Sequence, residues 1–264
     1  MRQNHVRAKL KRGETSIGTW LSLPDPTAAR LMARVGFDWL NVDLEHTGTS
    51  FETAATTFAL TALEGPAPLA RVPWNTGENI KRVLDNGAWG VIVPMVNSAA
   101  EARAVVEAAR YAPLGNRSVG GQLHAANFNT APANYYEKAN DEILVAIMAE
   151  HIACIEALEE IAAVPGIDVL FIGPNDLLSS MGLKPGFESP DAQFNAALKK
   201  VLAVAKKNGI APGIHVADAA MAKKRIEEGF QFIAVASEIG MMLAKAQEIA
   251  KALNLGTSAA VARY

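Results

Sequence analysis

The chain has 264 residues, of which 50% are hydrophobic and 20% are charged, so it can form a large buried core. Its formal net charge of −2 gives no electrostatic reason to bind nucleic acid or an anionic membrane surface. We therefore expect small molecules as its ligands.

The N-terminal segment, MRQNHVRAKLKRGET, is charged and lacks the apolar stretch of a signal peptide. We expect a short helix there and a cytoplasmic protein, because the longest apolar stretches, such as residues 143–149, are too short to span a bilayer. Cys154 is the only cysteine, which excludes an internal disulfide. Its apolar helical context predicts a buried, inert thiol.

Short apolar segments alternate with helical segments along almost the whole chain, which is typical of a parallel α/β fold. Each short segment is apolar on both faces, as in strands covered on both sides. The expected strands are residues 16–22, 39–43, 68–72, 90–94, 144–149, 169–172, 211–215 and 232–236.

Helices are expected after each strand from their apolar spacing and their caps. The first reads PTAARLMARV, with Pro26 at its start and Gly36 after its end. The expected helices are residues 26–35, 53–63, 78–84, 99–109, 155–163, 191–208, 219–228 and 240–253. Eight strand–helix units favour a single (β/α)8 TIM barrel over residues 1–264; an open doubly wound sheet is the alternative.

Two segments depart from this alternation and are expected to be long loops. Residues 111–141 are rich in Gly, Asn, Ala and Pro and lie between the fourth helix and the fifth strand, far beyond the usual connection length. Residues 173–187 follow the sixth strand, at the barrel face that carries active sites.

Polar residues follow the carboxyl ends of several expected strands, where a barrel places its catalytic residues. Each one alone is equally compatible with a solvated loop, but the set favours an active site. The candidates are Asp43, Glu45, His46, Arg71, Glu150 and Asp176.

Glu150 and Asp176 follow neighbouring strands, so their carboxylates are expected to converge. A hard divalent cation such as Mg²⁺ or Mn²⁺ would relieve their repulsion and take its other ligands from water and substrate. The alternative is that one of them pairs with a lysine or arginine. A zinc site of histidines and cysteines is not expected, because the five histidines are scattered and the cysteine is single.

His46 is a candidate general base, because imidazole titrates near neutral pH and an adjacent carboxylate can orient it. Arg71 presents a fixed cationic fork suited to an oxyanion or a carboxylate; the alternative is an internal ion pair with Asp43 or Glu45. Asp43 is counted with the catalytic candidates. His215 is expected to pack in the core or to line the pocket.

The segment FIGPND after the sixth strand is a candidate substrate-binding turn. Gly173 and Pro174 allow close approach to the backbone, and the amides of Asn175 and Asp176 can meet a carboxylate. No GxGxxG or P-loop motif is present. The lysines are expected on helices rather than at strand ends, which argues against a lysine-dependent aldolase.

In combination, WLNVDLEH, RVPWN, VPMV, the AE pair at Glu150 and FIGPNDL resemble the HpcH/HpaI aldolase family, from about Gly18 to Leu253. The resemblance implies a divalent-metal-dependent (class II) pyruvate aldolase that uses Mg²⁺, Mn²⁺ or Co²⁺. Such an enzyme reversibly cleaves 4-hydroxy-2-oxo acids into pyruvate and an aldehyde. The alternatives are a related metal-enolate lyase or oxaloacetate decarboxylase and, more remotely, a non-catalytic barrel that binds a metabolite.

The resemblance also implies roles for individual residues. Glu150 and Asp176 match metal ligands, His46 a proton acceptor and Arg71 a transition-state stabiliser, while Asn175 matches a position whose backbone contacts substrate.

Two further positions concern the assembly and the substrate. Asp85 matches an aspartate that raises the basicity of the active-site histidine, but it is expected at the opposite end of its own barrel from His46. A neighbouring subunit would then supply it, in a homo-oligomer that the resemblance implies to be a hexamer or trimer. Met148 stands where the family commonly has Gln, so a polar contact to pyruvate is absent there.

Overall fold

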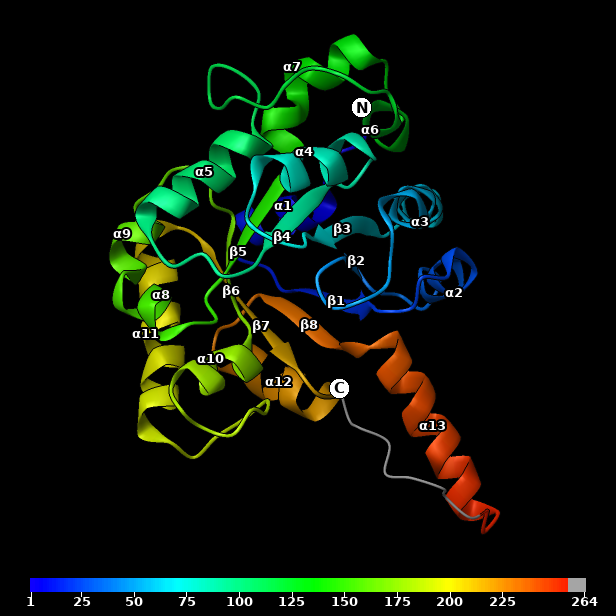
Figure 1. The fold of residues 1–264 in the computed structure, drawn as a ribbon, viewed down its shortest axis with the longest axis vertical. Coiled ribbons are helices and arrows are strands. Elements are labelled where there is room, and N and C mark those ends of the chain that lie inside the picture. Colours follow the sequence, from blue (N-terminus) through cyan, green and yellow to red (C-terminus); the bar gives the residue numbers. More distant parts are fainter. Residues whose placement is uncertain (256–264) are drawn as a thin grey trace.

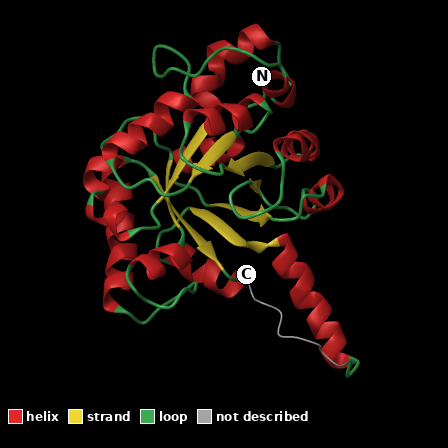
Figure 2. Cartoon of the chain, in the orientation of Figure 1, coloured by secondary structure: helices red, strands yellow, loops and turns green. Residues whose placement is uncertain are grey.

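The computed structural model describes residues 1–255, and residues 256–264 of the expected domain lie outside this range. Eight parallel strands close into a barrel in the order β1-β2-β3-β4-β5-β6-β7-β8, surrounded by helices (Figures 1 and 2). The strands are β1 (Ser16–Leu21), β2 (Trp39–Asp43), β3 (Ala67–Arg71), β4 (Gly90–Val93), β5 (Leu144–Met148), β6 (Val169–Ile172), β7 (Ala211–Val216) and β8 (Phe232–Ser237). The expected barrel is confirmed, and so are all eight strands to within one residue at either end.

The helices follow the expected alternation, beginning with the short N-terminal helix α1. They are α1 (His5–Lys11), α2 (Pro26–Met32), α3 (Phe51–Glu64), α4 (Gly77–Asp85), α5 (Ala99–Ala109), α6 (Leu123–Asn127), α7 (Pro132–Glu142), α8 (Ile152–Glu156), α9 (Leu158–Ala162), α10 (Pro174–Ser180), α11 (Ala192–Asn208), α12 (Ala219–Glu227) and α13 (Glu238–Ala252).

Side-chain caps explain where most of the helices begin. Asp25 accepts hydrogen bonds from two backbone amides of the first turn of α2, and Pro26 occupies the first helical position. Ser50, Thr76 and Ser98 cap α3, α4 and α5 in the same way. These interactions are local, which is why the starts of the helices were predictable from the sequence.

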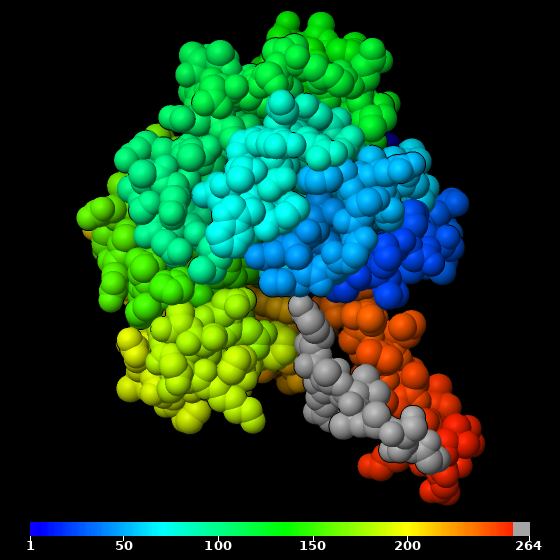
Figure 3. All heavy atoms as spheres, in the orientation of Figure 1, coloured from blue at the N-terminus to red at the C-terminus, as the bar shows by residue number. Residues whose placement is uncertain are grey.

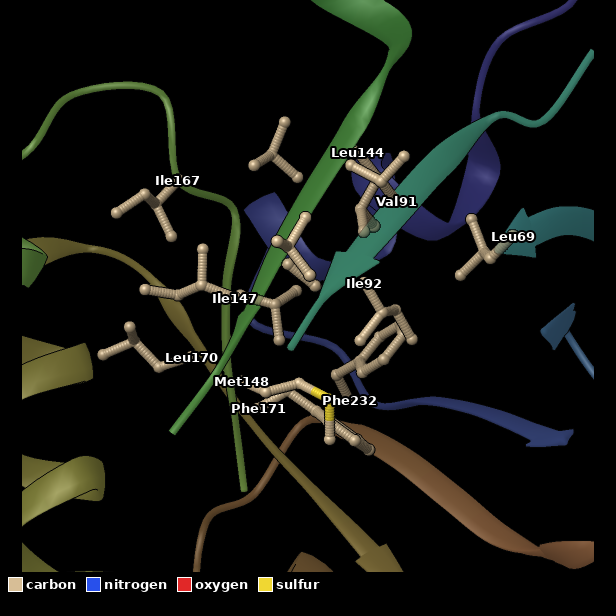
Figure 4. Close-up of a cluster of buried hydrophobic side chains, with 14 of the residues drawn as sticks. Leu69, Val91, Ile92, Leu144, Ile147, Met148, Ile167, Leu170, Phe171 and Phe232 are labelled. Atoms are coloured by element: carbon tan, nitrogen blue, oxygen red, sulfur yellow. The ribbon is translucent and has the colours of Figure 1, made fainter. Parts of the chain in front are cut away.

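The barrel interior is filled by strand side chains, so it forms a core and no channel. Figure 4 shows apolar side chains of β3, β4, β5, β6 and β8 packed together, with Met148 beside Phe171 and Phe232. The rings of Trp39 and Phe232 stack with centroids 4.2 Å apart. Ligands therefore have access only at the ends of the barrel, and the polar strand ends lie at the carboxyl end.

The structure corrects three expectations about the connections. Residues 111–141, expected as a loop, contain α6 and most of α7. Residues 173–187 begin with α10, which starts at Pro174 directly after β6. The single helix expected over residues 155–163 is two short helices, α8 and α9. α6, α8, α9 and α10 have only five to seven residues, so they show few apolar repeats in the sequence. α7 is longer, but it has no side-chain cap, and only Tyr135 and Ala139 are buried in it.

α13 leaves the barrel instead of lying against it. In Figures 1 and 3 this orange-red helix projects away from the rest of the protein. Only its first residue, Glu238, is a buried position. Met242 and Ile249 of α13 and Leu253 directly after it are 53%, 50% and 65% exposed, so this apolar surface has no packing partner within residues 1–255.

Within residues 1–255, no helix combines the length and the apolarity needed to cross a bilayer.

Candidate active site

A cavity of about 420 Å³ opens at the carboxyl ends of the strands. Its walls come from the ends of β1, β2, β3, β5, β7 and β8 and from the segment after β6. The lining residues are Trp20, Ser22, Asp43, His46, Arg71, Met148, Gly173, Pro174, Asn175, Asp176, Ser179, Pro185, Phe187, His215 and Ser237. Most of the expected site residues are therefore brought together in one cavity.

Arg71 is held at the cavity by a two-point ion pair with Asp43. The two residues are register partners on β3 and β2, and the guanidinium donates from Nε and Nη2 to the two carboxylate oxygens over 2.9 and 2.7 Å. Burial opposes the ionisation of Asp43, but the hydrogen bond and charge of Arg71 hold its pKa below its usual range. Arg71 Nη1 also lies 3.2 Å from Glu45 Oε2. The ion pair considered for Arg71 is confirmed, and it fixes the guanidinium in one orientation.

His46 stands at the cavity edge with its side chain 48% exposed. The backbone amides of Glu45 and His46 both donate to Asp43 Oδ1, so the turn after β2 is held by the same carboxylate as Arg71. His46 Nε2 lies 3.5 Å from Glu45 Oε2. Burial raises the pKa of Glu45 above its usual value. The imidazole is thus accessible to a ligand and has a carboxyl group beside it.

Glu150 is a buried acid that forms no ion pair within residues 1–255. Its Oε1 accepts a hydrogen bond from the backbone amide of Met95 over 2.8 Å. Met95 has a positive φ of 52°, a conformation that a non-glycine residue rarely adopts. Burial raises the pKa of Glu150 to about 8, and the nearby charge of Asp176 acts in the same direction. A carboxylate in this position favours the approach of positive charge.

Asp176 lies in the first turn of α10, four residues after the end of β6, and it lines the cavity. Neither Asp176 nor Glu150 forms an ion pair with any other side chain in the range 1–255, so the lysine or arginine partner considered as the alternative is not observed. Within the same range, no three or more histidine, cysteine or acidic side chains are grouped as a metal site.

The two carboxylates nevertheless fit a divalent cation by their chemistry. Both offer hard oxygen donors, the charge of Asp176 raises the cost of ionising Glu150, and Glu150 is removed from water. Gly173 leaves the space in front of Glu150 open, because a Cβ at this position would lie 2.7 Å from Glu150 Oε2. A two-carboxylate site leaves the remaining coordination positions to water and substrate oxygens.

Met148 places an apolar thioether in the cavity wall beside Gly173. A Cβ on Gly173 would lie 3.0 Å from Met148 Cε and 2.7 Å from Glu150 Oε2, so both side chains lie against the glycine. Pro174 and Asn175 continue the same wall of the cavity. The substrate-binding candidates predicted from FIGPND therefore all line the cavity.

Asp85 lies elsewhere in the molecule. It is the last residue of α4, and its carboxylate accepts a hydrogen bond from the buried Arg117 over 2.7 Å. Asp85 does not line the cavity that contains His46. As expected from its place at the opposite barrel end, the chain does not bring these two residues together by itself.

Several lining residues were missed by the sequence reasoning, chiefly Trp20, Phe187 and the serines Ser22, Ser179 and Ser237. Trp20 and Ser22 occupy the end of the first strand, and this position alone would have identified them. Phe187 belongs to the segment after α10, and no local pattern marks it. His215 lines the cavity, which is one of the two expected outcomes.

Cys154 is buried in α8. Burial raises the pKa of its thiol to about 12, so the thiolate is not formed at neutral pH. The expectation of an inert cysteine is confirmed.

Comparisons with known proteins agree with this geometry. A family model described as HpcH/HpaI aldolase/citrate lyase matches residues 16–245. A 4-hydroxy-2-oxo-heptane-1,7-dioate aldolase from Shigella sonnei is 38% identical over 249 residues, which cover 94% of this chain and 94% of that protein.

Solved structures are similar over nearly the whole chain. An HpcH/HpaI aldolase/citrate lyase family protein from Burkholderia cenocepacia J2315 has a TM-score of 0.88 at 31% identity, and the match covers 96% of this chain and 100% of that one. An HpcH/HpaI aldolase from Desulfitobacterium hafniense DCB-2 has a TM-score of 0.87 at 30% identity, with 96% and 97% covered.

Proposed function

Because the chain belongs to the HpcH/HpaI aldolase/citrate lyase family, we propose that it is a divalent-metal-dependent pyruvate aldolase. It would reversibly cleave a 4-hydroxy-2-oxo acid into pyruvate and an aldehyde. The observation that carries this proposal is the convergence of His46, Arg71 and Asp176 on one cavity, with the buried carboxylate of Glu150 next to Gly173.

Glu150 and Asp176 are the residues that would hold the cation, which we propose to be Mg²⁺, Mn²⁺ or Co²⁺. When bound, such an ion supplies Lewis-acid polarisation of the oxygen atoms of a 2-oxo acid. The fit rests on the two hard donors and on the burial that raises the pKa of Glu150 to about 8.

Arg71 would stabilise the negative charge that develops on the substrate. Its guanidinium is already oriented by the two hydrogen bonds to Asp43, so little reorganisation is needed as charge appears. Asp43 thereby acts as the positioning residue for Arg71 and, through the amides of Glu45 and His46, for the turn that carries the base.

His46 would move the proton. In the cleavage direction its imidazole accepts the proton of the 4-hydroxyl group as the bond between C3 and C4 breaks. Its exposure at the cavity edge gives a substrate hydroxyl access to it, and Glu45 Oε2 lies 3.5 Å from its Nε2. The carboxylate end of the substrate would lie against the backbone at Gly173 and Asn175.

We also propose that the protein is a homo-oligomer, a trimer or hexamer, with pyruvate and an aldehyde as its small-molecule ligands. The support is the apolar surface of α13 together with a second cavity of about 500 Å³ between α2, β1 and α12. That cavity has Ile17, Val35, Phe37 and Ile226 among its walls. α13 of a second copy offers matching apolar side chains, and such an assembly is the setting in which Asp85 would reach a neighbouring His46.

The direct test is to incubate the purified protein with pyruvate and glycolaldehyde and to follow the 4-hydroxy-2-oxo acid product. We expect turnover with Mg²⁺, Mn²⁺ or Co²⁺, its loss with EDTA, and its return when metal is added.

Oxaloacetate is the comparison substrate, since the family description includes citrate lyases. Faster decarboxylation of oxaloacetate than aldol chemistry would establish the related metal-enolate lyase instead. No turnover of either substrate with any of the metals would favour the non-catalytic metabolite-binding barrel.

A further inference from the structure

A row of rings extends along one wall of the cavity, starting at Arg71. The guanidinium carbon of Arg71 lies 4.4 Å from the ring centre of Trp20, and the Trp20 ring lies 5.5 Å from that of His215. His215 in turn meets the edge of Phe187, with ring centroids 5.0 Å apart. Pro185 lines the cavity close in sequence to Phe187. We call Trp20, His215 and Phe187 the ring wall.

The ring wall carries no positive charge at neutral pH. Burial lowers the pKa of His215 to about 4, so its imidazole is neutral. Among the lining residues within 1–255, Arg71 is the one arginine and no lysine is present. Arg71 is already paired with Asp43 and lies 3.2 Å from Glu45. Lys184 precedes Pro185 in the chain but does not line the cavity.

The cavity is larger than the pyruvate half of the substrate requires. Its volume of about 420 Å³ falls in the usual range of pockets for larger ligands. Pyruvate would lie near Arg71, Gly173 and Asp176 under the proposed function, so the ring wall is left for the other reactant. In the synthetic direction the pyruvate methyl carbon loses a proton and bonds to the aldehyde carbon, whose oxygen gains a proton.

We propose that the ring wall is the aldehyde subsite and that it selects an uncharged aldehyde with an apolar substituent. This inference rests on the proposed aldolase function and deepens it by naming the substrate class. A carboxylate at the far end of the aldehyde would be desolvated against Trp20 and Phe187 without a cationic partner, which is costly. An apolar substituent would gain from burial against the same rings.

The test compares two aldehydes of the same shape in the wild-type enzyme. Succinate semialdehyde carries a distal carboxylate, and 4-methylpentanal has two methyl groups in place of the two carboxylate oxygens. With pyruvate saturating, we expect kcat/KM for 4-methylpentanal to be higher by about tenfold or more. Equal values, or a preference for succinate semialdehyde, would overturn the proposal.

A charge introduced on the ring wall should reverse this preference. Phe187→Arg should shift the ratio of the two kcat/KM values toward succinate semialdehyde by about tenfold or more. Leu114→Arg adds the same charge at an exposed position outside the cavity and should leave the ratio as in the wild type. An unchanged ratio in Phe187→Arg would count against the subsite. If that variant does not fold, the wild-type comparison alone decides.

The proposed aldolase function is tested separately. The measurement is deuterium exchange into the methyl group of pyruvate in D₂O, with Mn²⁺ and no aldehyde. Exchange without a preference for 4-methylpentanal leaves the aldolase proposal standing and removes the subsite proposal. Absence of exchange overturns both.

Discussion

At the scale of single residues, the Asp43–Arg71 pair links stability to function. Both side chains are buried, and each compensates the charge of the other through two hydrogen bonds. Removing one partner of a buried ion pair leaves an uncompensated buried charge, whereas replacing both partners leaves no such charge.

We therefore expect Arg71→Met to lower the free energy of unfolding by about 3–5 kcal/mol. The double variant Asp43→Asn with Arg71→Met should recover much of this loss, because no buried carboxylate is then unpaired. Urea unfolding at pH 7 would measure the wild type, Asp43→Asn, Arg71→Met and the double variant. A double variant as unstable as the sum of the single variants would contradict this account.

His46 permits a second prediction. His46→Ala should lower kcat by about 10²- to 10⁴-fold if the imidazole is the general base, with a smaller effect on KM. Steady-state kinetics with pyruvate and glycolaldehyde would measure this. The matched control is His5→Ala, since His5 contacts the carbonyl of Asp38 near the opposite end of the barrel. A near-normal kcat in His46→Ala would remove the assignment.

A third prediction concerns His215 and the pH dependence of the free energy of unfolding. Its pKa is lowered by burial to about 4 in the folded protein from about 6.5 in the unfolded chain. The unfolded chain therefore binds more protons between these values, so stability is lost as the pH falls through this range.

Between pH 7.5 and 5, this group should reduce the free energy of unfolding by about 2 kcal/mol. His215→Asn should show a correspondingly smaller decrease over the same interval, measured by urea unfolding at both pH values. The paired comparison cancels the contribution of His124, whose pKa is also lowered by burial. Identical decreases in the two proteins would exclude His215 as the source.

At the scale of elements, the junction between β6 and α10 determines the space available around Glu150. Gly173 has an ordinary negative φ of −94°, so the backbone does not require glycine here. What matters is the space that its missing side chain leaves. A methyl group at this position would meet Glu150 Oε2 and Met148 Cε.

Gly173→Ala should therefore displace the Glu150 carboxylate and weaken Mn²⁺ binding by about 10- to 100-fold. Isothermal titration calorimetry would measure the affinity without turnover. Gly186→Ala is the control in the following segment, where a Cβ would meet no atom closer than 3.6 Å. Equal Mn²⁺ affinity of Gly173→Ala and the wild type would argue against Glu150 as a ligand.

At the scale of the whole molecule, α13 places apolar side chains where the rest of residues 1–255 leaves them exposed. Met242 and Ile249 are seven residues apart and share one face of the helix, and Leu253 follows its last residue, four positions after Ile249. The cavity of about 500 Å³ is lined by Ile17 of β1, by residues 35–38 between α2 and β2, and by Ile226 of α12.

The double variant Ile249→Lys with Leu253→Lys should convert the proposed oligomer to monomers, because it places two charges on the apolar face of α13. Size-exclusion chromatography with light scattering would measure the mass. Gln247→Lys changes a polar exposed position of the same helix and should leave the mass unchanged. A wild-type protein that is already monomeric would refute the oligomer proposal.

The sequence by itself determined the eight strands, most of the long helices and the end of the barrel that carries the site. Apolar runs, Pro and Gly positions and capping residues act over a few neighbouring residues, so all eight strands were predictable. Parallel strands bring their carboxyl ends to one face, and for this reason Asp43, His46, Arg71 and Asp176 could be expected to meet in one cavity.

Only the tertiary structure decided how those residues are held and what surrounds them. The Asp43–Arg71 hydrogen bonds, the amide of Met95 on Glu150 and the contact of Gly173 with both neighbours join residues far apart in the chain. The ring wall and the projecting α13 depend likewise on packing between distant elements. Such contacts leave no local periodicity, because their geometry is fixed only when the barrel closes.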